Sequence, residues 1–263
     1  MKKWFCMLMC VVMLVACMQE NNGRESKKIN ENKQITPLRT YKVTAYPYTP
    51  FVIRDGKGEV GGFEIEILQA IAKNQNIRFE FVPMLTNWEM LFKSIENQQN
   101  DLLSAAMYPN PERAARFEIS EPYMDTRFML LAGKGVMVNG LADLRGKRLA
   151  VFVNSMAEQE ILSLPYAKEI SLVPIKSVYE GVKAVLAGEA DVVYGDGVVL
   201  KYYANQFQAQ GVRLSVDAHA EKHQFVFLIS KGNRELLATV NAGLAAIQAD
   251  GTLDRIKHKW LEK

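Results

Sequence analysis

The stretch that decides the fold is DLLSAAMYPNPERAARFEISEPY, residues 101–123. Its first part is an apolar run, which predicts a buried strand over residues 101–107. Small residues at the end of this run let a ligand approach backbone amides, and Arg113 follows with a planar guanidinium that matches a carboxylate. The stretch therefore predicts a carboxylate-binding site. Taken alone, Arg113 could also be a surface arginine, and its neighbour Arg116 is expected to be one.

From Leu38 onward, short β-branched or aromatic runs alternate with helical patterns, which is typical of an α/β fold. Strands are predicted over residues 42–45, 78–82, 101–107, 147–153 and 191–194. Helices are predicted over residues 63–74, 88–97, 177–187, 234–249 and 253–261, with a further helix that begins near residues 154–155.

Two further strand-like passages, residues 127–132 and 223–230, are placed so that the chain could cross to a second lobe and return. The second lobe would then be inserted into the first. Lobe one is predicted to comprise residues 38–124 and 224–263, and lobe two residues 125–223.

The amino-terminal segment has the pattern of a secretory signal. Two lysines precede an apolar run over residues 4–16, which is too short to span a bilayer comfortably. The quartet Leu-Val-Ala-Cys at residues 14–17 resembles the lipobox of bacterial lipoproteins, which implies lipidation of Cys17 and a membrane anchor; the alternative is an ordinary signal with an incidental cysteine. Residues 17–37 are polar and lack periodicity, so they are expected to form a disordered tether.

Composition excludes several classes of function. Cys6 and Cys10 lie within the predicted signal, so the mature protein is expected to form no disulfide. Removing the two leader lysines from 32 basic residues leaves 30 against 29 acidic ones, and this near-neutral balance argues against a nucleic-acid partner. The three histidines lack a spaced set of Cys or carboxylate partners, so no metal site and no cofactor are expected.

Residues 101–123 resemble the first-lobe signature of family 3 of the bacterial extracellular solute-binding proteins. That signature is roughly D-x-hydrophobic-hydrophobic-small-small-x-T-x-T-x-E-R, followed by F-S-x-P-Y. Residues 62–67, GFEIEI, resemble the family's G-F-D-hydrophobic-D-hydrophobic pattern, with Glu in place of both Asp residues. Two carboxylates at this helical spacing do not share a face, so charge compensation at a helix amino terminus is the expected role. The resemblance implies a two-lobed periplasmic-binding-protein (Venus flytrap) fold.

The resemblance also implies roles for particular residues. Arg113 would bind a ligand's α-carboxylate, and Asp196, which ends the second lobe's G-x-A-D-hydrophobic stretch, would bind the α-amino group. Asp196 alone could simply cap a following helix. Tyr48 would pack over the ligand side chain and Trp88 would wall the pocket from the other side, with packing on their own lobe as the alternative for both.

The positions at which this sequence departs from the family pattern bear on which ligand it would bind. Ala106 stands where Gly or Ser is usual, and Tyr108 places a large ring where a short threonine hydroxyl is usual. Ala106 could retain backbone contacts with the ligand, whereas Tyr108 could shrink the pocket or turn its phenol toward the ligand. The second lobe's G-T-T or G-T-G turn is also replaced, and the residues expected to form that wall are Phe152, Asn154, Ser155 and Met156. This set favours an apolar, aromatic or flat cationic ligand side chain over an acidic one.

These patterns predict a monomeric, lipid-anchored receptor that traps an amino acid or related small carboxylate and delivers it to the permease of an ATP-driven importer. A second hypothesis is a sensor or partner-binding lipoprotein without transport. A third is enzymatic, because the fold also occurs in periplasmic cyclohexadienyl dehydratases and beside lytic transglycosylase domains. The transglycosylase would need a further catalytic domain, and a dehydratase would need an acid in the cleft, for which Glu89 and Glu158 are candidates.

Overall fold

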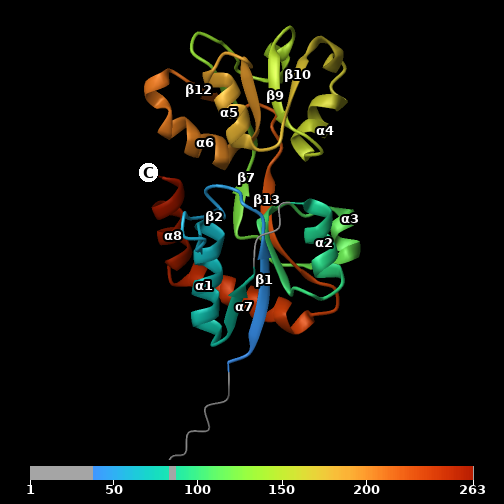
Figure 1. The fold of residues 1–263 in the computed structure, drawn as a ribbon, viewed down its shortest axis with the longest axis vertical. Coiled ribbons are helices and arrows are strands. Elements are labelled where there is room, and N and C mark those ends of the chain that lie inside the picture. Colours follow the sequence, from blue (N-terminus) through green and yellow to red (C-terminus); the bar gives the residue numbers. More distant parts are fainter. Residues whose placement is uncertain (1–37, 83–86, 263) are drawn as a thin grey trace, which may run out of the picture. The chain divides into compact units, whose positions relative to one another are not determined.

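The apolar run of residues 101–107 forms strand β5 (Leu102–Met107), which lies inside the first of two β-sheets. All six residues are buried, because successive side chains point to opposite faces and helices cover both faces. The computed structural model describes residues 38–82 and 87–262 (Figure 1). The predicted signal (residues 1–16), the tether (residues 17–37) and Cys17 lie outside the described residues.

The first sheet combines parallel and antiparallel strands. β1 pairs in parallel with β4 and β5, whereas β13 runs antiparallel to β5, β6 and β7. Its strands, in spatial order, are β4 (Arg78–Phe81), β1 (Thr40–Ala45), β5, β13 (His223–Ser230) and β6 (Phe117–Ile119), and β7 (Met124–Thr126) pairs with β13 beside this path. A short hairpin, β2 (Ile53–Arg54) with β3 (Val60–Gly61), precedes the first helix.

Helices pack on both faces of this sheet. In Figure 1, α1, α7 and α8 lie on one side of it and α2 and α3 on the other. The side chains that point from β5 toward α1 and α7 alternate with those that point toward α2, so each face has its own apolar cluster. The helices are α1 (Phe63–Gln75), α2 (Trp88–Glu96), α3 (Pro111–Arg116), α7 (Arg234–Ala249) and α8 (Thr252–Leu261).

The second sheet is built from residues 128–215. Its strands, in spatial order, are β10 (Ser171–Ile175), β9 (Arg148–Phe152), β11 (Val192–Asp196), β8 (Phe128–Ala132) and β12 (Arg213–Ser215). Its α-helices are α4 (Met156–Ser163), α5 (Val178–Leu186) and α6 (Gly197–Gln206), and its 3-10 turns are η1 (Leu141–Leu144), η2 (Ala167–Glu169) and η3 (Gln208–Gln210). Buried side chains of α4 and α5 pack on different faces of this sheet.

The chain passes between the two sheets at two adjacent places. It leaves the first sheet after β7 and returns at the start of β13, and these strands pair with each other, with Thr126 opposite His223. The second sheet with its helices, the second lobe, is thus inserted into the first sheet with its helices, the first lobe. The chain has the two-lobed α/β fold that the sequence predicts.

Candidate ligand-binding cleft

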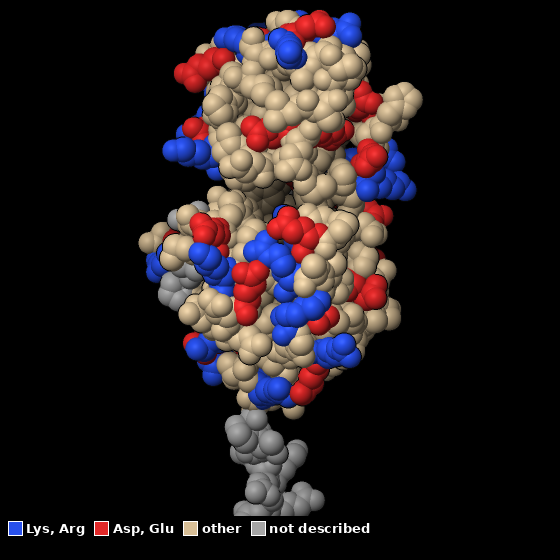
Figure 2. Space-filling model, turned by 90° about the vertical axis from the view of Figure 1, so that its right-hand side faces the viewer, with Lys and Arg blue, Asp and Glu red and all other residues tan. Residues whose placement is uncertain are grey.

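A cleft of about 410 Å³ opens between the lobes. Figure 2 shows the surface hollowed between the two lobes. The carboxyl ends of β5, β9 and β11 reach it, as is usual for ligand sites in α/β proteins. All ten residues that the sequence marks as ligand-binding line this cleft, and they are Tyr48, Trp88, Ala106, Tyr108, Arg113, Phe152, Asn154, Ser155, Met156 and Asp196.

Arg113 brings a positive charge to the cleft. Asn110 caps α3, because its side-chain oxygen accepts a hydrogen bond of 2.7 Å from the backbone amide of Arg113. The guanidinium donates to the carbonyl oxygen of Tyr108 and lies 5.9 Å from the centre of the Phe92 ring. Among the described residues, no carboxylate lies within ion-pair distance of it. Burial lowers the pKa of Arg113, but an arginine remains charged at neutral pH.

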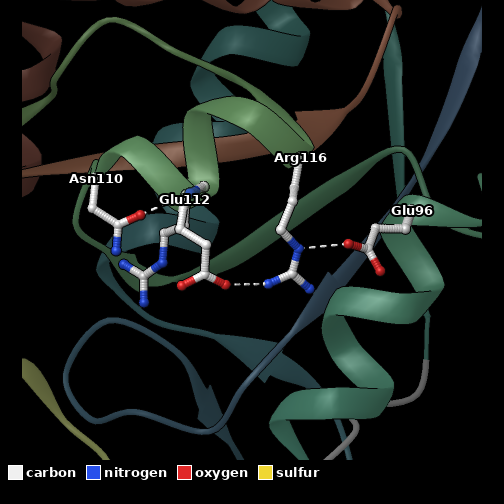
Figure 3. Close-up of polar contacts among 5 residues, drawn as sticks. Glu96, Asn110, Glu112 and Arg116 are labelled. Atoms are coloured by element: carbon white, nitrogen blue, oxygen red, sulfur yellow. Dashed lines mark hydrogen bonds and ion pairs between the residues drawn. The ribbon is translucent and has the colours of Figure 1, made fainter.

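Arg116 lies beside Arg113 and is already paired. Figure 3 shows it between Glu112 of its own helix and Glu96 at the end of α2. The two ion pairs measure 2.7 Å and 2.6 Å respectively. The Arg116 side chain is 33% exposed and also lines the cleft, but its charge is compensated by carboxylates of the protein. Arg113 is therefore the better partner for an anionic ligand group.

The end of β5 is held by a buried carboxylate. Glu64 of α1 is 0% exposed and accepts hydrogen bonds from the Ala106 amide at 2.9 Å, the Ser104 hydroxyl at 2.6 Å and the Tyr123 hydroxyl. Burial raises the pKa of Glu64 to about 7, although these hydrogen bonds lower it. The structure thus gives Glu64 a supporting role under the cleft, beyond helix-terminal charge compensation. The amide of Ala106 is already bonded and so is not free for a ligand.

Glu66 contacts the carboxy-terminal helix instead. Its side chain accepts from Lys259 at 2.7 Å and from the indole nitrogen of Trp260 at 2.6 Å. The two glutamates of the GFEIEI motif point to different partners, as their helical spacing predicts.

Asp196 joins the end of β11 to the start of α6 and reaches across the cleft. One carboxylate oxygen caps α6 by accepting the amides of Val198 at 2.9 Å and Val199 at 3.1 Å. The other accepts the hydroxyl of Tyr108, from the first lobe, and a longer bond of 3.4 Å from Thr126. Asp196 is only 3% exposed, and this burial raises its pKa to about 6. The helix-capping role and a position in the cleft therefore coexist.

The second-lobe wall is the turn between β9 and α4. Asn154 has φ of 59°, the left-handed region that asparagine tolerates better than most residues. Ser155 caps α4 by accepting the amide of Glu158 at 3.1 Å, and Glu158 in return accepts the amide of Asn154 at 2.6 Å. The sequence predicts a helix that begins near residues 154–155, and α4 begins at Met156. Phe152 and Met156 flank the turn and contribute apolar surface to the cleft.

Aromatic rings form the first-lobe wall. Trp88 stacks on Tyr46 with ring centres 4.4 Å apart and packs against Phe92 at 5.9 Å. Tyr48 stacks on Phe51 at 5.9 Å, and its hydroxyl has no hydrogen-bond partner among the described residues. Both rings contact their own lobe and also line the cleft. The two roles that the sequence leaves open for these rings, contact with a ligand and packing on their own lobe, are thus compatible.

Sequence reasoning did not single out several other lining residues, namely Phe92, Asn110, Phe128, Gln159, Val178 and Tyr194. Asn110 could have been found, because an asparagine before proline and three residues before Arg113 is a typical helix cap. The others are ordinary core or helix positions with no local signal.

The two candidate acids for a dehydratase do not line the cleft. Glu89 is exposed and pairs with Lys93 at 2.6 Å, and Glu158 is bonded to the amide of Asn154. Within residues 38–82 and 87–262, no group of three or more His, Cys, Asp or Glu side chains is arranged to hold a metal ion. No helix in that part of the chain is long and apolar enough to cross a membrane.

Two lobes joined by paired strands, with a cleft lined from both, define a protein that encloses a small ligand. The chain belongs to the bacterial extracellular solute-binding proteins, family 3, whose family model matches residues 42–263.

Similar proteins are found among curated sequences and solved structures. The amino-acid-binding protein AabA of Dichelobacter nodosus is 29% identical over 213 residues, which cover 80% of this chain and 83% of that protein. The arginine-binding extracellular protein ArtP of Bacillus subtilis (strain 168) is 26% identical over 264 residues, which cover 99% of this chain and 98% of that protein.

Among solved structures, an ancestral arginine-binding protein bound to arginine has a TM-score of 0.74 and 27% identity, covering 84% of this chain and 97% of that one. An ancestral amino acid-binding protein described as a precursor of cyclohexadienyl dehydratase has a TM-score of 0.72 and 28% identity, covering 84% and 95%.

Proposed function

We propose that this protein captures an amino acid, or a closely related small carboxylate, between its lobes for an ATP-driven importer. The observation that carries the proposal is the placement of Arg113 and Asp196 in one cleft. The first lobe contributes a guanidinium that pairs with no carboxylate of the described residues, and the second lobe contributes a buried carboxylate. A zwitterion needs both charges within a few ångströms, because desolvating each end is tolerable only with a matched partner. The names of the similar proteins support the same ligand class.

Ligand contacts drawn from both lobes couple binding to closure. A carboxylate held by Arg113 and an amine held near Asp196 would link the lobes, so the ligand would favour the closed state. A permease could then distinguish loaded from empty protein by the relative position of the lobes.

The side-chain end of the cleft favours apolar, aromatic or flat cationic groups. Trp88, Phe152 and Met156 offer apolar contact area, and the aromatic faces can also receive a guanidinium or imidazole. Arg116, the second basic residue at the cleft, is neutralised by Glu96 and Glu112, so an acidic ligand side chain finds little compensation there.

Calorimetric titration of the purified protein with each of the twenty amino acids and with small carboxylates tests the proposal. We expect one or a few amino acids to bind with micromolar or tighter affinity, with arginine, histidine or an aromatic residue among them. Absence of binding by every zwitterionic amino acid would refute the assignment.

Import and lipid anchoring need separate tests. Uptake of the labelled ligand should fall when the gene is deleted and return with the wild-type gene. Unchanged uptake would favour a sensing role without transport. Cys17, outside the described residues, is proposed as the lipidation site. A Cys17→Ser variant should therefore lose metabolic labelling by palmitate and leave the membrane fraction.

We also propose that the protein binds its ligand without turning it over. Support comes from the positions of Glu89 and Glu158 away from the cleft. Proton NMR of a cyclic phenylalanine precursor incubated with the protein should show no loss of water. Dehydration at a rate proportional to protein concentration would instead establish an enzyme, with Asp196 as the first acid to replace.

A further inference from the structure

Tyr108 is held rigidly where the two lobes meet. Its ring stacks on Phe225 with centres 5.0 Å apart, meets Phe128 edge-on at 5.7 Å and lies 5.3 Å from His223. These neighbours belong to β13, at whose start the chain returns to the first lobe, and to β8, the first strand of the second lobe. The direction of the phenol hydroxyl is therefore set by packing, and it donates to Asp196.

The carboxylate of Asp196 has most of its hydrogen-bonding directions occupied by the protein. A carboxylate has about four lone-pair positions. The amides of Val198 and Val199 take those of one oxygen, and the hydroxyl of Tyr108 takes one position of the other. The Thr126 hydroxyl makes only a long contact of 3.4 Å with that second oxygen and lies at the same distance from the carbonyl oxygen of Arg127. A ligand amine that approached Asp196 directly would have to displace one of these donors or this long contact.

The phenol oxygen of Tyr108 remains open as an acceptor. Its single proton points to Asp196, and its oxygen accepts no hydrogen bond from the residues that the structure describes. A donor bonded to a carboxylate also becomes a stronger acceptor itself. Tyr108 is half-buried and lines the cleft, whereas Asp196 is 3% exposed, so Tyr108 is the more accessible residue of the two. The hydroxyl of Tyr48, which has no partner within residues 38–82 and 87–262, lies in the electrostatic field of the same carboxylate and offers a second phenol oxygen.

We infer that the ligand's ammonium group is received by the phenol oxygen of Tyr108, with Asp196 supplying the negative charge from behind it. This inference rests on the proposed function, since it assigns the amine end of the amino acid that the cleft would hold. Tyr108 is then the residue that distinguishes an amino acid from the corresponding acid without an α-amino group.

A simpler role for Tyr108 would be to tie the lobes together. Tyr203 of α6 supplies the comparison, because its hydroxyl bonds the side chain of Thr49 in the first lobe and it does not line the cleft. Loss of either hydroxyl removes a tyrosine bond between the lobes, but only Tyr108 would contact the amine. A general effect on lobe closure should change the affinity of every ligand equally, whereas loss of an amine acceptor should affect only ligands that carry the amine.

The experiment compares matched ligands by calorimetry at pH 7.5. The probes are the amino acid that the wild-type protein binds most tightly and its des-amino acid, for example L-arginine with 5-guanidinopentanoate or L-phenylalanine with 3-phenylpropanoate. The variants are Tyr108→Phe and, as the matched control, Tyr203→Phe. We expect Tyr108→Phe to weaken binding of the amino acid at least tenfold and binding of its des-amino partner less than threefold. Tyr203→Phe should leave the ratio of the two affinities unchanged.

Amino-acid affinity within threefold of wild type in Tyr108→Phe would overturn the inference, as would an equal loss for both ligands. These results are distinct from failure of the proposed function, in which the wild-type protein itself binds no amino acid and the inference falls with it.

A second variant keeps the test decisive if Tyr108→Phe does not fold. Tyr108→Thr would replace the ring by a short hydroxyl and open Asp196 to direct contact with the amine. The loss of amino-acid affinity caused by Asp196→Asn should then be at least fivefold larger in the Tyr108→Thr variant than in the wild-type protein. Equal costs in both backgrounds would show that Tyr108 does not stand between the amine and the carboxylate.

Discussion

Glu64 of α1 accepts the backbone amide of Ala106 at 2.9 Å, so a buried carboxylate holds the end of β5 on which the cleft is built. Ala106 has φ of 48°, a left-handed conformation that costs a residue with a side chain about 1 kcal/mol or more. The hydrogen bond to Glu64 helps to offset that cost. The glutamate thus positions the cleft without lining it.

The raised pKa of Glu64 makes stability depend on pH. Its pKa is about 7 in the folded protein, against an ordinary value of 4.5 for an exposed glutamate, so between these values the folded state binds more protons than the unfolded state. Its contribution to stability is therefore fully present below pH 4.5 and is lost as pH rises through 7, by at most about 3 kcal/mol. Glu64→Gln should remove this loss, as measured by urea unfolding at pH 4.5, 5.5, 6.5 and 7.5.

Glu66→Gln is the matched control, because Glu66 lies two residues away on the same helix and bonds Lys259 and Trp260. It should retain the wild-type fall in stability over this range. The same fall in Glu64→Gln as in the wild type would contradict the assignment of the titration to Glu64.

Gly62 fixes the loop that carries Tyr48. It has φ of 118°, and a Cβ at this position would lie 2.4 Å from the carbonyl oxygen of Phe51. That carbonyl accepts the amide of Glu64 at 3.0 Å, at the start of α1. Gly62→Ala should therefore destabilise the protein by about 3 kcal/mol or more, through backbone strain and displacement of the loop.

The neighbouring Gly61 provides the control, since a Cβ there would meet nothing within 4 Å. Gly61→Ala should change the free energy of unfolding by less than about 1 kcal/mol. Thermal and urea unfolding of both variants measure the difference, and similar losses in the two would argue against a close approach at Gly62.

Arg113 and Arg116 lie on the same short helix but differ in their partners. Arg113→Ala should weaken ligand binding by about a hundredfold, because the ligand carboxylate would lose its charged partner inside the cleft. Arg116→Ala should weaken it less than about fivefold, since its charge is already neutralised by Glu96 and Glu112. Calorimetry on both variants checks the contrast, and equal effects would mean that the unpaired charge is not what selects the ligand.

Much of the fold follows from hydrophobic periodicity. The helix expected over residues 63–74 ends at Gln75, and the strand expected over residues 101–107 is β5. Both have long, regular patterns, which local sequence specifies well. β10, β12 and α3 were not predicted as elements. α3 (Pro111–Arg116) spans less than two turns, so its periodicity is too short to detect, and only its cap signals it.

Residues of the cleft can be predicted where a sequence motif marks them. Contacts between residues that only the tertiary fold brings together cannot. Arg113 and Asp196 follow strands with recognisable patterns, so their side chains could be placed at strand ends. The bond between Tyr108 and Asp196 joins residues 88 apart in sequence, and that between Glu64 and Ala106 joins residues 42 apart. No local pattern encodes such pairings, because they depend on how the two lobes and their helices pack.

The pKa of Asp196, about 6, predicts that amino-acid binding weakens in mild acid. An ammonium group is stabilised by the ionised carboxylate, so binding favours the deprotonated form, and protonation competes with it. At pH 5 the affinity should be about tenfold lower than at pH 8, the factor expected one unit below a pKa of 6. The des-amino ligand should show little change over this range, because Arg113 stays charged and the ligand carboxylate stays ionised. Calorimetry from pH 5 to pH 8 measures both ligands. Asp196→Asn should bind the amino acid weakly and with little dependence on pH, whereas a tenfold fall that persists in this variant would place the titrating group elsewhere.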